Sequence, residues 1–201
     1  FRPAINKQQY QAHIERIQDY ILAGDCYQVN YAQRFEATLE GDAWWAYRHV
    51  RTLLAGGFSG FLRTAEDHAI LSLSPERFLR INQGTVTSQP IKGTAPRHSD
   101  PEQDAALAKA LLNSEKDRAE NVMITDLLRN DLGQFCQTGS VNVTELCGLH
   151  SYNNVHHLVS TVEGKLAPGV SAGQMLLATS PGGSITGAPK KRAVEIIAEL
   201  E

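Results

Sequence analysis

The sequence predicts an α+β fold, with largely antiparallel sheets flanked by helices, and three observations lead to this fold class. Segments in which apolar and polar residues alternate occur in hairpin-like groups joined by short turns. Segments with helical periodicity lie between these groups, without the strict strand–helix alternation that is typical of a parallel sheet. The chain has 201 residues, of which 42% are hydrophobic, and this is enough apolar material for one sizeable core.

The N-terminal half is predicted to mix helices with strands. Asn6 can cap a first helix, whose apolar residues recur at helical spacing until Gly24 ends it. Gly56 and Gly57 are expected to break a second, shorter helix. The expected segments are a strand at 27–31, the short helix at 44–54, and strands at 69–73, 78–81 and 85–91, the last two joined by a tight turn at 82–84.

The C-terminal half is predicted to place its strands between helices. Ser114 begins the longest helix, and Gly133 is expected to stop it. A glycine-rich loop precedes a last helix, which starts near Pro189. The remaining expected segments are helices at 105–112 and 171–178 and strands at 141–143 and 155–162.

Composition excludes several classes of protein. The formal net charge is -3 and the pI is about 6.2, and no basic stripe indicates nucleic acid as a partner. The three cysteines are widely spaced and form no C-x-x-C pair, so we expect free thiols rather than disulfides or a zinc site. No apolar run approaches the roughly 20 residues of a membrane span, and no signal peptide opens the chain. We therefore expect a cytoplasmic protein that does not bind membranes.

The two ends of the sequence both look cut. The first residue is Phe1 rather than methionine, and residues 193–201 still have the pattern of an open helix. We therefore expect residues 1–201 to be a partial domain, with a part missing on each side.

A first candidate for chemistry is Lys92, in the segment Pro-Ile-Lys-Gly-Thr at 90–94. A side chain at a strand end is aimed by a rigid element, which suits a nucleophile or a base. Gly93 removes a side chain beside it, so that a ligand can approach the backbone. An amine must lose its proton before it attacks carbon. An exposed surface lysine beside a turn is the alternative interpretation.

A second candidate is the pair Asp117 and Glu120, near the start of the helix that Ser114 caps. Residues three apart share a helix face, and two carboxylates completed by water and an anionic ligand suit Mg²⁺. Acidic residues are also favoured in a first helical turn because they oppose the helix dipole. The pattern therefore allows a metal site or an ordinary helix start.

Two neighbouring histidines, His156 and His157, lie in the predicted strand at 155–162. Their side chains point to opposite faces, so they do not form a joint metal site, and one can face a pocket while the other packs. Histidine transfers protons readily near neutral pH, although a purely structural role stays open.

The glycine-rich loop at 181–190 has features of an anion site. Gly182 and Gly187 match the glycine spacing of a phosphate loop, but Ala188 and Pro189 replace the expected lysine and hydroxyl residue. This argues against a nucleotide triphosphate. Small residues still expose backbone N–H groups, and the N-terminus of a helix attracts anions, so the loop suits a carboxylate substrate or is a surface turn.

The order of the motifs is more specific than any one of them. Ser-Pro-Glu-Arg-Phe at 74–78 is followed by the segments 90–94, 116–121 (Lys-Asp-Arg-Ala-Glu-Asn), 157–160 (His-Leu-Val-Ser) and 181–190. This succession, together with Gly-Asp-Cys-Tyr-Gln-Val-Asn at 24–30, covers essentially the whole chain and resembles the chorismate-binding family. The resemblance implies a partial chorismate-binding catalytic domain over 1–201, with chorismate as substrate and Mg²⁺ as cofactor.

The resemblance also implies residue roles. Lys92 would be a covalent nucleophile, Glu76 a general acid or base at the departing hydroxyl, and His157 a residue that orients or assists at the ring. Asp117 and Glu120 would hold Mg²⁺, although glutamate is more common in the family at position 117. Substrate oxygens would be bound by Gly93, Thr94, Gly182, Gly183, Ser184 and Lys190, the last of which could instead cap local structure.

Lys92 indicates the branch of the family. The resemblance implies that a lysine here directs ammonia to C4 of chorismate, towards p-aminobenzoate and folate, whereas the anthranilate-forming branch carries alanine and aminates C2. The ammonia would come from a glutamine amidotransferase subunit. Two alternatives stay open: C2 amination, and a truncated, inactive fragment that only folds or binds the amidotransferase.

Overall fold

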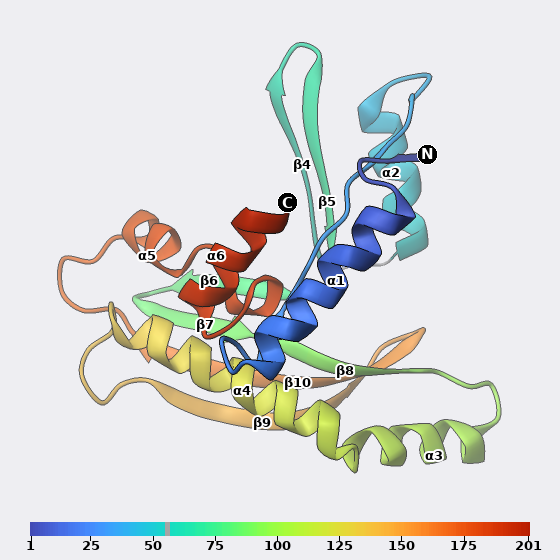
Figure 1. Ribbon diagram of the computed structural model, residues 1–201. Helices are drawn as coiled ribbons and strands as arrows, with labels where there is room; N and C mark the ends of the chain where they lie inside the picture. Colours follow the sequence, from blue (N-terminus) through green and yellow to red (C-terminus); the bar gives the residue numbers. More distant parts are fainter. Residues whose placement is uncertain (55–56) are drawn as a thin grey trace.

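The computed structural model describes residues 1–54 and 57–201, and it is built around one antiparallel sheet (Figure 1). Strand β10 (Val155–Lys165) lies at its centre and pairs with β9 (Asn142–Ser151) on one side. On the other side, its C-terminal half pairs with β7 (Thr85–Gln89) and its N-terminal half with β8 (Ile91–Pro96). β6 (Arg77–Asn82) pairs with β7 and completes the five strands.

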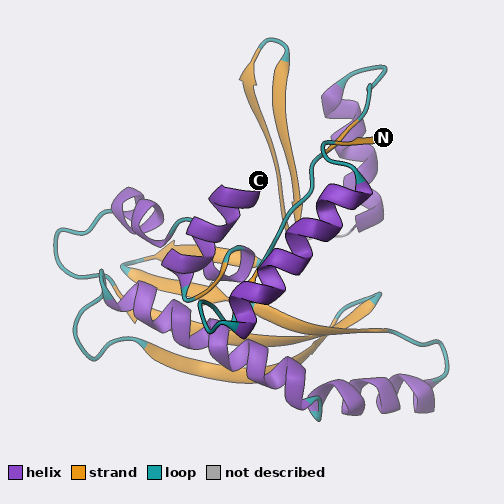
Figure 2. Cartoon of the chain, viewed as in Figure 1, coloured by secondary structure: helices purple, strands orange, loops and turns teal. Residues whose placement is uncertain are grey.

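Helix α4 (Glu115–Gly133) packs along this sheet and forms the main core with it (Figure 2). α3 (Pro101–Leu112) precedes it, and the N-terminal ends of both helices are capped, by Asp100 and Ser114. Each cap oxygen accepts an N–H bond that the first helical turn would otherwise lack. The core joins the apolar side of α4 to the sheet, and its buried residues are Val86, Ile124, Leu128, Leu132, Cys136, Val162 and Met175.

The N-terminal helix α1 (Lys7–Leu22) packs against the last helix, α6 (Lys190–Leu200), although they lie at opposite ends of the sequence. Ile17 and Ile196 are buried at this contact, and Arg16 forms an ion pair with Glu199 at 2.6 Å. Two short ladders accompany the helices. β1 (Arg2–Pro3) pairs with β3 (Phe35–Glu36), and β2 (Gln28–Val29) pairs with β11 (Gly187–Ala188).

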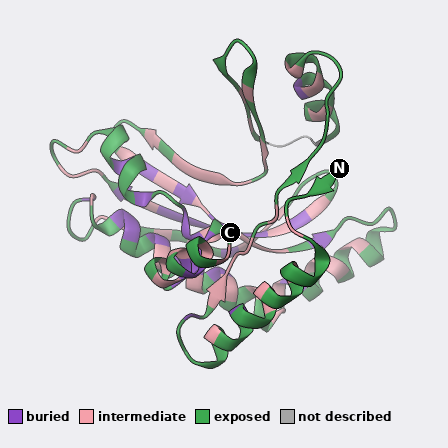
Figure 3. Ribbon diagram, turned by 45° about the horizontal axis from the view of Figure 1, so that its top comes forward, coloured by how far each residue is buried: buried purple, intermediate pink, exposed green. Residues whose placement is uncertain are grey.

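A hairpin of β4 (Phe58–Ala65) and β5 (His68–Ser74) extends away from the sheet beside α2 (Ala43–Leu54) (Figure 1). Trp44 of α2 contacts Phe61 of β4 edge-on, with ring centroids 5.1 Å apart. Most of the hairpin is exposed, whereas burial is concentrated where the sheet meets the helices (Figure 3). The other helices, α5 (Ala172–Thr179) and the short 3₁₀ turn η1 (Gly183–Ile185), lie in the C-terminal loop region.

The predicted fold class is confirmed, and the helices that begin at Asn6 and Ser114 are confirmed with their caps. Several strand predictions differ from the structure. The strand expected at 27–31 is only the two-residue β2. The strand over 85–91 is divided at Pro90, which has no N–H to donate to a ladder. The strand at 141–143 is part of the longer β9, and β4 was not predicted. Gly56, the expected helix breaker, lies outside the described residues, and in the described ranges no helix is long and apolar enough to cross a membrane.

Asp104 of α3 connects three segments of the structure. Its carboxylate accepts bonds from Arg97 Nε at 2.9 Å and from the His98 backbone N–H at 2.9 Å. His156 Nε2 lies 3.1 Å away, and its Nδ1 is 2.7 Å from Ser151 Oγ. The Arg97 guanidinium, with the His98 N–H, holds the pKa of Asp104 well below its usual range. His156 is therefore the packed histidine of the predicted pair.

We expect Asp104→Asn to lower the free energy of unfolding at pH 7 and to flatten its pH dependence. A carboxylate with a depressed pKa stabilises the fold above its unfolded pKa, about 3.9, and this contribution is lost as pH falls below that value. Urea denaturation at intervals from pH 7 to pH 3 measures the difference, which should shrink as pH falls. Asp126→Asn is the control, since Asp126 is exposed and pairs with Arg129. Equal curves for the two variants would contradict the prediction.

Candidate active site

Lys92 lies on a β-bulge in β8. Thr94 pairs with His157 and Ile91 pairs with Val159, so three steps along β8 match two steps along β10. The extra residue falls at Lys92 and Gly93, and Gly93 takes a φ of +88°. Bulges change the direction of a side chain relative to the sheet. The Lys92 ammonium donates to the Ser184 backbone carbonyl at 3.2 Å, across 92 residues of sequence.

Gly93 is required by its neighbours as well as by its backbone angle. A Cβ built at this position would lie 2.9 Å from Asp117 Cβ and 3.1 Å from Leu111 Cδ1. The bulge therefore lets α4 approach β8 closely. This contact brings one predicted metal ligand, Asp117, beside the segment that carries the predicted nucleophile.

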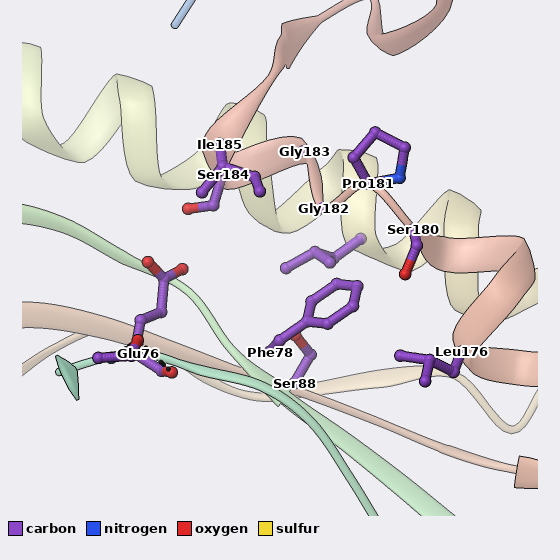
Figure 4. A pocket seen from close by; sticks show the side chains of 12 residues that line it. Glu76, Phe78, Ser88, Leu176, Ser180, Pro181, Gly182, Gly183, Ser184 and Ile185 are labelled. Carbon is purple, nitrogen blue, oxygen red and sulfur yellow. Dashed lines mark hydrogen bonds between the residues drawn. The ribbon is translucent and has the colours of Figure 1, made fainter. Parts of the chain in front are cut away.

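Glu76 follows β5 and faces the loop that contains η1. Its Oε1 accepts from the Ile91 backbone N–H at 3.4 Å, one residue before Lys92. The Ser74 hydroxyl accepts from the Glu76 N–H at 3.2 Å and so fixes the turn. Figure 4 shows the Glu76 carboxylate and Ser184 on facing sides of one cavity.

This cavity, of about 390 Å³, has mainly apolar walls. Its lining comes from β6, β7, α4, α5 and the loop after α5, and includes Phe78, Ser88, Leu128 and Leu176. The glycines pack closely, since a Cβ on Gly182 would lie 3.0 Å from the Phe78 ring and one on Gly183 would lie 2.3 Å from Leu127 Cδ2. The Ser184 hydroxyl is buried and has no hydrogen-bond partner within the described residues. An unsatisfied buried hydroxyl in a cavity is well suited to bind a polar ligand atom.

His157 and Thr94 form a second polar pair across the β8–β10 ladder. Thr94 Oγ1 lies 2.8 Å from His157 Nδ1, and the ring also contacts Tyr152 edge-on. Burial lowers the pKa of His157, and a bond to the Gly93 backbone opposes part of this effect. The imidazole is therefore held mainly neutral at pH 7, in which form one ring nitrogen can accept a proton.

Asp117 and Glu120 lie in the first turns of α4, as predicted from the sequence. The Ser114 hydroxyl accepts from the Asp117 N–H at 3.3 Å, and Glu120 lies 3.7 Å from Lys116. Within residues 1–54 and 57–201, His, Cys, Asp and Glu form no group of three or more that could hold a metal. Two carboxylates suffice for Mg²⁺ only when substrate and water supply the other oxygens, and the magnesium assignment stays a prediction.

Lys190 contacts a different partner from those of Lys92. Its ammonium forms an ion pair with Asp131 of α4 and donates to the Thr179 carbonyl at 3.2 Å. Asp131 is 7% exposed, and burial raises its pKa while Lys190 opposes the rise. This arrangement favours the structural alternative for Lys190, and its role as a substrate ligand stays a prediction.

We expect Lys190→Met to destabilise the fold by about 3–5 kcal/mol, because it leaves a buried carboxylate without a partner. Lys191→Met is the matched control, since Lys191 is exposed. Urea denaturation at pH 7 measures both. Adding Asp131→Leu to Lys190→Met should recover most of the loss, because the unpaired charge is then gone. A loss below about 1 kcal/mol, the scale of an exposed pair, would count against a structural role.

Sequence reasoning missed two polar residues of the site region. Asn121 is fully buried on α4, where its Nδ2 donates to the Leu158 carbonyl at 3.0 Å and its Oδ1 accepts from Ser160. A signal for it existed, because Asn121 shares the core-facing side of α4 with Ile124 and Leu128. Asn30, whose amide bonds to the Ser184 carbonyl, has no comparable local signal.

The family model for the chorismate binding enzyme matches residues 1–201, and the chain therefore belongs to the chorismate binding enzyme family. Among curated proteins, it is 52% identical over 201 residues to aminodeoxychorismate synthase component 1 of Klebsiella aerogenes, covering all of this chain and 44% of that protein. It is 42% identical to anthranilate synthase component 1 of Pseudomonas aeruginosa, covering 100% and 41%. Among solved structures, anthranilate synthase component I from Streptococcus pneumoniae TIGR4 has a TM-score of 0.89 at 37% identity, covering 100% and 44%. The chain thus spans less than half the length of these relatives.

Proposed function

We propose that this chain takes part in the amination of chorismate at C4, as the corresponding part of an aminodeoxychorismate synthase component 1. The observation that carries the proposal is Lys92, set on a bulge with its amine towards the cavity loop. The similarity to the Klebsiella aerogenes protein supports the same branch of the family.

The proposed chemistry has two stages. The Lys92 nitrogen attacks C2 with its lone pair, the conjugated double bonds of the ring shift, and the C4–O bond breaks. The hydroxyl takes a proton from Glu76 and leaves as water. Ammonia then attacks C4, the double bonds shift back, and the C2–N bond to Lys92 breaks. The proton released from the new C4–N group returns to Glu76, directly or through His157. The sum replaces a hydroxyl with an amino group and releases water, without oxidation or reduction.

Glu76 and Ser184, which line the cavity, and His157, which lies outside its lining, each have a part in this scheme. Glu76 lies across from Ser184 and accepts from the N–H of Ile91, the residue before Lys92, so it can serve a group bound between Ser184 and the lysine. The free hydroxyl of Ser184 would bind a substrate oxygen. His157, held by Thr94, would orient the ring or accept a proton from the incoming ammonia. The apolar walls exclude water that would compete with ammonia for C4.

Asp117 and Glu120 would hold Mg²⁺ together with the substrate carboxylate. The ion would neutralise part of the negative charge of a dicarboxylate substrate. Ammonia would come from a glutamine amidotransferase subunit, in keeping with the designation of the relative as component 1.

The test uses the full-length gene product with chorismate, Mg²⁺ and ammonium, and identifies the product by chromatography and mass spectrometry. We expect 4-amino-4-deoxychorismate. Glutamine should replace ammonium only when an amidotransferase subunit is added. The 201-residue chain is assayed in parallel, and failure of both proteins to aminate chorismate would contradict the proposal and favour a fragment that only folds or binds a partner.

The rival function is anthranilate synthesis, which the 42% identity to the Pseudomonas aeruginosa protein keeps open. It differs in product, because ammonia would enter at C2 and the enolpyruvyl group would be lost as pyruvate. Fluorescent anthranilate as the main product would establish this rival and refute the C4 proposal.

A further inference from the structure

The Ser184 carbonyl is bound by two side chains at once. Asn30 Nδ2 lies 2.5 Å from its oxygen, and Lys92 Nζ lies 3.2 Å from it. A carbonyl oxygen has two lone pairs, so these two donors fill it. Asn30 is the closer donor and Lys92 the more distant one.

Asn30 is held in this position by the backbone around it. The β2–β11 ladder pairs Val29 with Gly187, and the Asn30 N–H continues it with a bond to the Thr186 carbonyl at 2.7 Å. On its other side, Asn30 Oδ1 accepts from Gln28 Nε2 at 3.1 Å. The amide is therefore oriented by two neighbours before it reaches Ser184.

Two donors on one oxygen share its electron density, so each is held less strongly than it would be alone. A charged donor without a competitor forms a shorter and stronger bond to a carbonyl. For Lys92 that bond would be unproductive, because its nitrogen must leave the Ser184 oxygen and give up a proton before its lone pair can attack carbon. With the neutral Asn30 amide on the same oxygen, Lys92 stays near the cavity but is only loosely bound to the Ser184 carbonyl.

We propose that Asn30 is a positioning residue for Lys92. The Asn30 amide occupies the Ser184 carbonyl and so keeps the lysine amine available for reaction. The catalytic meaning of this proposal rests on the proposed function, whereas the effect on the amine does not. Asn30 itself touches neither the reacting atoms nor the lysine in this scheme.

The first experiment measures the reactivity of the amine without any substrate. The 201-residue chain and its variants are labelled with trace acetic anhydride at pH 8, and mass spectrometry gives the labelling of Lys92 relative to the exposed Lys165. Asn30→Leu keeps the branched shape of the side chain but has no donor, and we expect it to lower the relative labelling of Lys92 several-fold. Asn30→Gln keeps an amide and should restore part of it.

Asn142→Leu is the matched control, because the exposed Asn142 also donates its amide to a backbone carbonyl, that of Ser140, at 2.9 Å. It should leave Lys92 labelling unchanged. Circular dichroism verifies that each variant is folded, and if Asn30→Leu is not, Asn30→Ala replaces it. Unchanged or increased labelling of Lys92 in folded Asn30→Leu or Asn30→Ala protein would overturn the proposal, because the Asn30 amide would then not be what keeps the lysine amine available.

The second experiment uses the full-length gene product with chorismate, Mg²⁺ and ammonium. Asn30→Leu should lower kcat several-fold and leave the KM for chorismate within about twofold of the wild-type value. One outcome is that Asn30→Leu lowers the labelling of Lys92 but the wild-type protein makes no 4-amino-4-deoxychorismate. This would refute the proposed function and leave the link between Asn30 and Lys92 standing. Normal amination by a variant with unchanged labelling would refute that link alone.

Discussion

Replacing Lys92 with alanine is expected to abolish formation of 4-amino-4-deoxychorismate by the full-length gene product. Without the amine, no covalent bond can block C2, and ammonia loses the arrangement that directs it to C4. Removing a catalytic nucleophile costs on the order of 10⁴-fold or more in rate. Any residual turnover should shift towards anthranilate, because C2 is then open to ammonia. Chromatography of the products from chorismate, Mg²⁺ and ammonium measures both effects.

A further variant separates the amine from its charge. Lys92→Arg keeps a cation that can donate to the Ser184 carbonyl, but a guanidinium stays protonated and is a poor nucleophile. It should therefore be as inactive as Lys92→Ala. Lys109→Ala is the matched control, since Lys109 is exposed on α3 and the variant should retain activity. Para-directed amination at the wild-type rate by either Lys92 variant would show that the nucleophile has been assigned wrongly.

The covalent intermediate provides a direct measurement. When ammonium is omitted, wild-type protein incubated with chorismate and Mg²⁺ should gain the mass of chorismate less one water. Proteolysis should place this mass on the peptide that contains Lys92. A mass that maps to another peptide would contradict the mechanism even if the product were correct.

The sequence allowed prediction of features that depend on local chemistry. The predicted caps Asn6 and Ser114 do cap helices in the structure, and a cap needs only a side-chain oxygen and the next three residues. The candidate residues also follow local patterns. Lys92 precedes a glycine, and that glycine takes the positive φ that only a residue without a Cβ adopts readily.

The sequence did not allow prediction of contacts between distant segments. The bulge at Lys92 depends on how β8 registers with β10, and the periodicity of one strand carries no information about its partner. Ser184 is reached by Asn30 across 154 residues and by Lys92 across 92 residues. β4 was missed for a related reason, since most of its residues are exposed and it shows little apolar alternation.

Gly187 is the position where a single methyl group should have the largest effect on stability. Its φ is +146°, and a Cβ there would lie 2.0 Å from the Gln28 carbonyl oxygen and 2.9 Å from Ala193 Cβ. The first of these is backbone within the β2–β11 ladder, so it cannot move away as the end of a flexible side chain can. We expect Gly187→Ala to cost about 3 kcal/mol or more, the sum of backbone strain and overpacking.

Gly60→Ala is the control for Gly187→Ala, because Gly60 of β4 has open space around it and no positive φ. It should be neutral or stabilise by up to about 1 kcal/mol. Urea denaturation measures both variants. Gly187 is part of the ladder that holds Asn30 beside Ser184, so Gly187→Ala should also alter the acetic anhydride labelling of Lys92. Lys190→Met removes the partner of Asp131 instead, and it should not have this effect on the labelling. A Gly187→Ala protein as stable as Gly60→Ala would mean that β2 and β11 do not approach each other as the structure has them, and the link between Asn30 and the lysine would lose its support.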